Sequence, residues 1–419
     1  TEFTYNPCVE IGKYPITDDG RSGWQGCNLT ELNGSMCNTP EQFYEACIAG
    51  SVLGTLQAGY TDFPFLSSAS KEIFEHESLI GVSVTGWMNN PEVLFDPEVM
   101  RKGAEIVKQI NKEVAAIIGI NPAARCTAVK PSGNASVLLG TASGIHGEHS
   151  KHYIRHVQMN TEGEVAQLFS QHIPEMVENS VWSANGSDIA ICFPVTTPEG
   201  SVYKHDLLGV KQLEYVKICQ QNWIEYGTNL DLCVDKNLRH NVSNTITVDN
   251  WEEVTKYVYD NRQWFCGISF LAATGDKAYP QAPFTEVFMA DEILAKYGNA
   301  SMFASGMITR ALDAFSNNLW NACSTALGYG EDLSVATHEN AMKRDWVRSY
   351  NKFSDKWFNG DKQITSDMLK DVYNLHKWCK ITSNIRDIDW TTELKEKKYT
   401  DADTLGAIAC AGGVCEITF

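Results

Sequence analysis

The sequence predicts an α/β fold in which strands alternate with helices. Segments 189–193, 243–248 and 267–271 have the length and apolar character of buried strands, and amphipathic stretches of helical length separate them. Such alternation is typical of a parallel sheet or barrel built from right-handed β-α-β units. A chain of 419 residues with 43% apolar residues can bury a sizeable core around such strands.

The other elements follow from local signals, taken in chain order. Residues 17–21 read as a turn, and the alternating segment 80–86 predicts a strand. Asp96 and Pro97 predict the start of a helix that runs at helical spacing to Gly119. Residues 207–223 predict a helix that stops at Gly227, and Asp249 predicts the cap of the next one. Residues 285–380 read as helices rich in Trp, Met and Ala.

Composition excludes several classes of partner. Thirty-four basic against 52 acidic residues give a net charge of -18, which argues against a broad nucleic-acid surface. No run of 18 apolar residues and no export signal is present, so we expect a cytoplasmic protein without membrane contact. The thirteen cysteines form no Cys-x-x-Cys pairs, and four histidines between residues 146 and 156 have mixed spacing, so no metal site is predicted.

The motif at residues 6–12, Asn-Pro-Cys-Val-Glu-Ile-Gly, organises the rest of the chain. In an extended segment Asn6, Cys8 and Glu10 would project from one face. A thiol, a general base and a hydrogen-bonding amide would then meet one small molecule. The alternative is that Cys8 is a small buried hydrophobe, as most lone cysteines are.

A loop of small residues after Lys130 is a candidate anion site. It joins a short strand to a predicted helix start, where unpaired N–H groups and the helix dipole attract negative charge. A plain turn is the alternative, since no Walker spacing is present. The candidate phosphate-binding residues are Ser132, Gly133, Asn134, Ala135 and Ser136.

The carboxyl-terminal stretch reads as a charged linker followed by a dithiol. Residues 393–403 are rich in Lys, Glu and Asp, and Cys410 and Cys415 follow with small residues between them. A thiol pair beyond a polar linker suits a dithiol that visits two places. A disordered terminus with incidental cysteines is the alternative.

These stretches together resemble the ribonucleotide reductases, and most nearly the adenosylcobalamin-dependent (class II) enzymes of the monomeric ribonucleoside-triphosphate type. The similar segments are Asn-Pro-Cys-Val-Glu at 6–10, Cys-Asn-Leu at 27–29, Gly-Val-Ser-Val-Thr-Gly at 81–86, Pro-Ser-Gly-Asn-Ala-Ser at 131–136 and the Cys-x4-Cys tail. Two features depart from the family pattern: Asn134 replaces a threonine, and Cys27 lies 19 residues after Cys8. The Tyr-Tyr pair of class I, the glycyl-radical segment of class III and the Asp-x-His-x-x-Gly cobalamin signature are absent.

The resemblance implies a ten-stranded α/β barrel made of two five-stranded halves around a finger loop that carries the radical cysteine. This chain would supply the second half: a catalytic half-barrel over 1–285, a helical region over 286–385, and a linker with a redox-active tail over 386–419. Family members carry a long segment before the Asn-Pro-Cys motif. We therefore expect a split enzyme whose first half is a separate polypeptide, unless the sequence is a trimmed or processed product.

The resemblance also implies roles for single residues. Adenosylcobalamin would generate a thiyl radical on Cys8, Glu10 would act as general base on the 3′-hydroxyl of the ribonucleotide, and Asn6 would hydrogen-bond the sugar. Cys27 would be one of two reducing thiols, with Cys37 as a competing candidate.

The tail cysteines, Cys410 and Cys415, would relay electrons from a thioredoxin-like reductant.

Other functions stay open at this point. The substrate is expected to be a triphosphate, although a diphosphate or a class I-like enzyme is an alternative. A nonradical thiol enzyme with Cys8 as nucleophile, and a partner subunit without catalysis, are the rivals from other classes.

Overall fold

The chain folds into two compact units. The computed structural model describes residues 3–183, 185–273, 281–302, 304–306, 351–352 and 363–395. Unit 1 comprises Thr1–His149 and Thr197–Asp276, and unit 2 comprises Ser150–Thr196 and Lys277–Phe419. The boundaries of these units differ from the domain boundary expected at residue 285. The expected division into a catalytic half, a helical region and a tail stays a prediction. Cys410 and Cys415 lie outside the described residues.

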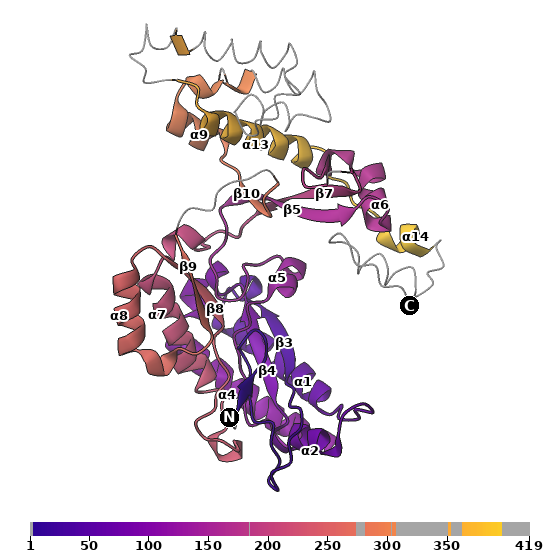
Figure 1. Cartoon of the computed structure of the whole chain (residues 1–419), viewed down its shortest axis with the longest axis vertical. Helices are drawn as coiled ribbons and strands as arrows, with labels where there is room; N and C mark the ends of the chain where they lie inside the picture. The colour runs from indigo at the N-terminus through magenta and orange to yellow at the C-terminus, as the bar shows by residue number, and fades with distance from the viewer. Residues whose placement is uncertain are drawn as a thin grey trace. The chain divides into compact units, whose positions relative to one another are not determined.

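Unit 1 combines a small hairpin with a parallel α/β arrangement (Figure 1). Its strands are β1 Thr4–Tyr5, β2 Gly12–Lys13, β3 Asn28–Asn33, β4 Ile80–Thr85, β8 Asn244–Val248 and β9 Ile268–Ala272. Its helices are α1 Pro40–Ala58, α2 Ser68–Glu77, α3 Pro91–Leu94, α4 Pro97–Ile118, α5 Gly133–Leu139, α7 Val210–Cys219 and α8 Trp251–Asp260.

Five extended segments of unit 1 run parallel to one another. β3 pairs with β4, and β8 pairs with β9, both in parallel register. Segment 125–129 joins the two pairs, because Val82 forms a parallel bridge with Thr127 and Val129 forms one with Val242. The parallel arrangement predicted for segments 243–248 and 267–271 is thereby confirmed, as is the strand at 80–86.

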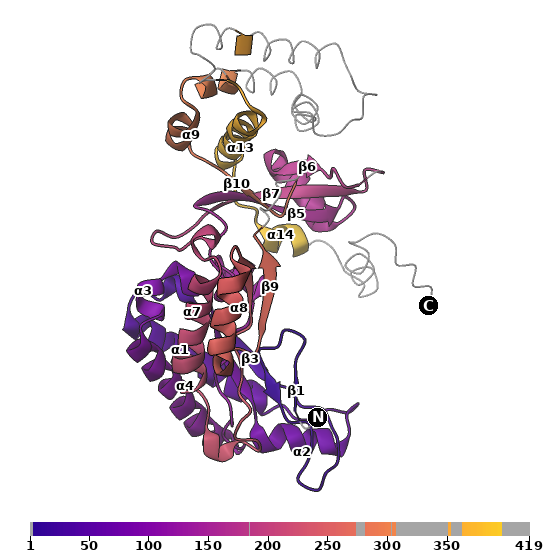
Figure 2. The same ribbon diagram turned by 60° about the vertical axis from the view of Figure 1, so that its left-hand side comes forward.

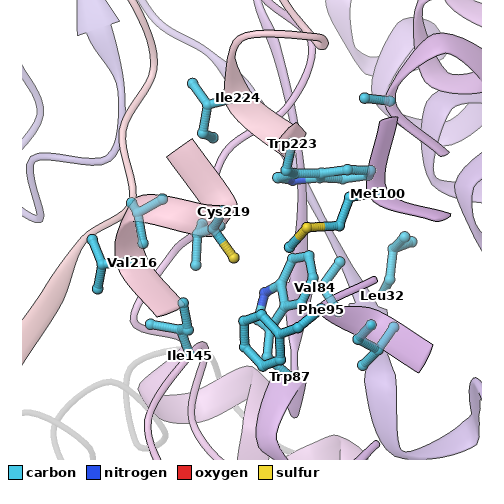
Figure 3. Packing of buried hydrophobic residues seen from close by; sticks show 14 of the residues in the cluster. Leu32, Val84, Trp87, Phe95, Met100, Ile145, Val216, Cys219, Trp223 and Ile224 are labelled. Atoms are coloured by element: carbon cyan, nitrogen blue, oxygen red, sulfur yellow. The ribbon is translucent and has the colours of Figure 1, made fainter. Parts of the chain in front are cut away.

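Helices cover one face of these strands and build the main core. Figure 2 shows α1, α4, α7 and α8 on one side of the strands and β1 on the other. Alternate residues of β4, namely Ile80, Val82 and Val84, are fully buried toward the helices. Trp87 and Trp223 are also fully buried, with ring centroids 6.1 Å apart (Figure 3). Each large side chain buried in this way contributes about 1.5–3 kcal/mol of transfer free energy.

The helix predicted from Asp96 to Gly119 forms as expected. The Asp96 carboxylate accepts hydrogen bonds from the backbone N–H groups of Glu98 and Val99, and Gly119 ends α4 with φ 76°. The next predicted cap is displaced by one residue, because Asn250 rather than Asp249 caps α8.

The opposite face of the parallel strands is polar. On β4, Gly81, Ser83 and Thr85 alternate with the core residues. A Cβ at Gly81 would lie 2.6 Å from Leu29 Cδ2, so a larger residue here would require the Leu29 side chain to shift. The hairpin of β1 and β2 packs on this face, because Ile11 Cδ1 would be 3.3 Å from the same Cβ. The polar face is therefore where functional groups gather.

Unit 2 contains an antiparallel sheet with helices. Its strands lie in the order β10, β5, β7, β6, with every pairing antiparallel. The bounds are β5 His152–Asn160, β6 Val177–Asn179, β7 Asp188–Thr196, β10 Phe284–Glu286, α6 Glu164–His172, α9 Ala290–Tyr297, α13 Ser366–Thr382 and α14 Trp390–Lys395.

Two expectations about unit 2 are wrong. The strand at 189–193 forms as part of β7, but it pairs antiparallel with β5 and does not belong to the parallel series. An apolar run shows burial but not strand direction. Residues 390–395, expected in a linker, form α14, because the Trp390 ring packs against Phe169 at 5.6 Å. The helices α9 and α13 agree with the helical region predicted between 285 and 380.

None of the helices in the described part of the chain combines the length and the apolar character needed to span a bilayer.

Candidate functional site

The Asn-Pro-Cys-Val-Glu motif forms the tip of the hairpin between β1 and β2. The Asn6 carbonyl accepts a hydrogen bond from Val9 N at 2.9 Å, and Asn6 Oδ1 accepts one from Ile11 N at 3.0 Å. The expectation of an extended segment with Asn6, Cys8 and Glu10 on one face is therefore wrong. The side-chain oxygen of Asn6 closes the turn, and Val9 takes a left-handed conformation with φ 65°.

The turn places the thiol and the carboxylate in different environments. Cys8 is exposed, whereas the Glu10 side chain is completely buried. Glu10 Oε1 lies 3.1 Å from Lys130 Nζ. Within the described residues Glu10 Oε2 has no hydrogen-bond partner. A buried acceptor without a donor is costly, so this oxygen is available to an external donor.

Asn241 fastens the turn to the parallel strands. Its side-chain amide donates to Val9 O at 2.9 Å, and its backbone N–H donates to Glu10 O at 2.8 Å. The Tyr5 hydroxyl contacts the side chains of Asn241 and Cys266, and burial is the main cause that raises the pKa of Tyr5 to about 12. No role was predicted for Asn241 from the sequence.

Lys130 connects Glu10 with a second carboxyl group. Burial alone would lower the pKa of Lys130, but the ion pair with Glu10 outweighs burial and raises it. The Lys130 backbone N–H donates to Ser83 Oγ, and Ser83 Oγ donates to Glu31 Oε1, both at 3.0 Å. Burial raises the pKa of Glu31 to about 7, against the opposing hydrogen bonds from Ser132 and Ser83. Sequence reasoning missed Glu31, although it follows the Cys-Asn-Leu segment by only one residue.

The small-residue loop continues directly from Lys130. Ser132 is buried with φ 41°, and α5 begins at Gly133. Ser136 N donates to Ser132 O at 3.1 Å, which closes the first turn of this helix. Gly133 and Asn134 are exposed, and Ala135 is half-buried. The loop and the hairpin tip thus share one region of unit 1 through Lys130.

Cys27 lies near the same carboxylate. Its Sγ is 3.7 Å from His240 Nε2, and burial, reinforced by the charge of Glu10 and opposed by Arg125, raises the pKa of the Cys27 thiol. The thiol is therefore protonated at neutral pH. The competing candidate, Cys37, is buried in the apolar core on the helix side.

In the described part of unit 2, one group of metal-ligand type comes together. The ligand atoms of His156, Glu178 and Cys192 lie within 4.8 Å of one another. Lys377 Nζ lies 2.7 Å from Glu178 Oε1 and 3.1 Å from His156 Nε2. The partly buried carboxylate of Glu178 already has the Lys377 ammonium as its cation.

The known proteins to which this chain is similar are ribonucleotide reductases. No protein-family model matches the chain. A protein of Dictyostelium discoideum described as "Probable adenosylcobalamin-dependent ribonucleoside-triphosphate reductase" is 22% identical over 301 residues, covering 68% of this chain and 36% of the relative. An adenosylcobalamin-dependent ribonucleoside-triphosphate reductase of Euglena gracilis is 23% identical over 292 residues, covering 66% of this chain and 36% of the relative. An adenosylcobalamin-dependent ribonucleoside-triphosphate reductase of Lactobacillus acidophilus is 28% identical over 184 residues, covering 35% of this chain and 25% of the relative.

A solved structure shares the fold. The crystal structure of a B-12 dependent (class II) ribonucleotide reductase matches 69% of this chain and 41% of its own, with a TM-score of 0.54 and 16% identity. The chain spans about a third of the length of the first two curated relatives. It is thus a homologue of the adenosylcobalamin-dependent, class II ribonucleoside-triphosphate reductases.

Proposed function

We propose that this chain takes part in the adenosylcobalamin-dependent reduction of ribonucleotides, preferably triphosphates, to 2′-deoxyribonucleotides. The observation that carries the proposal is the hairpin tip. It presents an exposed thiol, Cys8, two residues from a buried carboxylate, Glu10, whose second oxygen has no partner within the described residues. The homology to enzymes of this activity supplies the reaction class.

The exposure of the Cys8 thiol is consistent with a reaction that begins at a bound cofactor. A thiol that exchanges a hydrogen atom with a large external cofactor has to be accessible, and Cys8 is exposed at the tip of its turn. When bound, adenosylcobalamin supplies the radical that starts the reaction. Cys8 then removes the 3′-hydrogen of the ribonucleotide.

Glu10 receives the proton of the 3′-hydroxyl on its unpartnered oxygen, which eases departure of the 2′-hydroxyl. Asn6 binds the sugar through its amide nitrogen, because its amide oxygen already accepts the hydrogen bond that closes the turn. Residues 132–136 hold the phosphates.

The reducing electrons come from thiols. Cys27 and a second thiol become a disulfide when the substrate is reduced, and Cys410 and Cys415 restore them by thiol–disulfide exchange with a thioredoxin-like protein. The protonated state of Cys27 suits a thiol that gives up a hydrogen.

We further infer a split arrangement, in which a separate polypeptide completes a ten-stranded barrel around the hairpin as finger loop. The observation that supports the half-barrel is the set of five parallel segments in unit 1. In this arrangement 1–285 is the catalytic half, 286–385 is helical support and 386–419 is the redox tail.

The test is anaerobic mixing of the chain, the completing polypeptide, adenosylcobalamin and a ribonucleoside triphosphate, followed by electron paramagnetic resonance. We expect a coupled cobalt(II)–thiyl signal that Cys8→Ser abolishes. The control is Cys379→Ser, which removes an exposed thiol of unit 2 and should keep the signal. A signal that survives Cys8→Ser would refute the assignment, and turnover by the chain alone would refute the split arrangement.

A further inference from the structure

We propose that Glu31 is the acid partner of Glu10, supplying the proton with which the substrate 2′-hydroxyl leaves as water. The inference rests on the proposed ribonucleotide reduction and names a residue for a step in it. It starts from the polar face of the parallel strands, where two carboxyl groups meet one ammonium group.

Both carboxyl groups are linked to Lys130, one through its backbone N–H and Ser83 and the other through its side-chain ammonium. Glu31 Oε1 accepts from Ser83 Oγ at 3.0 Å, and Ser83 Oγ accepts from Lys130 N at 3.0 Å. The ammonium of the same lysine lies 3.1 Å from Glu10 Oε1. The carboxyls come from β3 and the hairpin, and β4 and the segment after residue 129 hold them in register.

The charges of this group fit one ionised and one protonated carboxyl. The Lys130 ammonium forms its ion pair with Glu10, whereas the hydrogen-bond partners of Glu31 are the hydroxyls of Ser83 and Ser132. The charged and titratable groups that act on this region are Glu10 and Cys8 from the hairpin and Lys130 itself, and α5 carries no charged residue. Burial keeps Glu31 about half protonated near neutral pH, with its pKa at about 7.

The unpartnered oxygen of Glu10 points independently to an external ligand. Glu10 is fully buried, and its Oε2 has no donor within the described residues. A hydroxyl on a bound molecule would satisfy it. Glu10, paired with an ammonium group, is assigned as the base, and Glu31, whose partners are neutral hydroxyls, is assigned as the acid.

The step balances as follows. After Cys8 has removed the 3′-hydrogen, Glu10 accepts the 3′-hydroxyl proton while Glu31 gives its proton to the 2′-oxygen. The C2′–O bond breaks, water leaves, and the unpaired electron passes to C2′ beside a 3′-carbonyl. Glu10 ends protonated and Glu31 ends ionised, so no external proton source is needed.

The experiment uses the complete enzyme with Glu31→Gln, Glu31→Asp and the surface control Glu72→Gln. Glutamine keeps the acceptor for Ser83 but carries no transferable proton. We expect Glu31→Gln to retain the cobalt(II)–thiyl signal and to lose at least about 100-fold in kcat. Glu31→Asp should recover part of kcat, and the fall in kcat above pH 7 should disappear in Glu31→Gln.

Two results would overturn the inference. One is a Glu31→Gln enzyme with kcat within about threefold of the unaltered protein and the same pH profile. The other is loss of the radical signal together with turnover, which would mean a structural role. Absence of the signal from the unaltered enzyme is a different failure, because it removes the proposed function itself and this inference with it.

Discussion

The ion pair between Lys130 and Glu10 should be the main electrostatic support of the hairpin tip. At 3.1 Å and an effective dielectric constant of about 20, the attraction between the two charges is about 5 kcal/mol. The Lys130 side chain is 30% exposed, so solvent screening reduces this to about 2–3 kcal/mol. Lys130→Met should therefore lower the free energy of unfolding by about that amount, since it leaves the carboxylate of Glu10 buried without a cation.

A double-mutant cycle isolates this interaction. Lys130→Met, Glu10→Gln and the combined variant are unfolded in urea and followed by near-ultraviolet circular dichroism. The combined variant should be more stable than the sum of the single changes predicts, by about 2 kcal/mol. The control cycle uses Lys71 and Glu75, which lie 3.7 Å apart and are both about half exposed. There the coupling should stay below about 0.5 kcal/mol.

If the effects of the Lys130 and Glu10 changes on the free energy of unfolding add within about 0.5 kcal/mol, the ion pair is screened like a surface pair and does not support the hairpin tip.

Three more predictions follow from burial. Glu77→Gln should lower the free energy of unfolding in urea by about 3–5 kcal/mol, because Arg125, fully buried and 2.7 Å from Glu77 Oε2, loses its counter-charge. The surface control Glu72→Gln should leave the urea midpoint unchanged. Equal urea midpoints for the Glu77→Gln and Glu72→Gln variants would contradict this prediction. The pKa of Glu31 is raised from 4.5 to about 7 in the folded state, so stability should fall by about 2 kcal/mol as pH rises from 4.5 to 7, and Glu31→Gln should remove that slope in urea titrations at several pH values. Iodoacetamide without denaturant should modify the exposed Cys8, Cys266 and Cys379 before the buried Cys47, Cys126 and Cys219, as measured by peptide mass spectrometry; equal rates would show that the burial pattern is wrong.

The sequence predicted the scaffold better than the site. Asp96 and Gly119 mark both ends of α4, because capping depends on neighbours within a few residues. The direction of β7 was missed, since it depends on pairing with β5, which lies far away in the chain. The turn at Asn6 was missed because alternate residues share a face only in an extended strand, and here the Asn6 amide bonds to the backbone instead.

The residues around Glu10 could not be predicted from the sequence, because they come from segments that are distant in the chain. Glu31, Lys130 and Asn241 meet Glu10 only after β3, β4 and the later segments have aligned in register. The resemblance to the family pointed to stretches next to Glu31 and Lys130, at 27–29 and 131–136. It did not say which side chains would face one another.

Val9 has a consequence for the thiol beside it. A β-branched residue at φ 65° stores on the order of 1–3 kcal/mol of backbone strain, which persists only if surrounding contacts impose it. The carbonyl that Val9 offers to Asn241 is one of those contacts. The peptide next to Cys8 is consequently held in one conformation by its neighbours, so the position of the Cys8 backbone is set by the fold and needs no bound molecule to fix it.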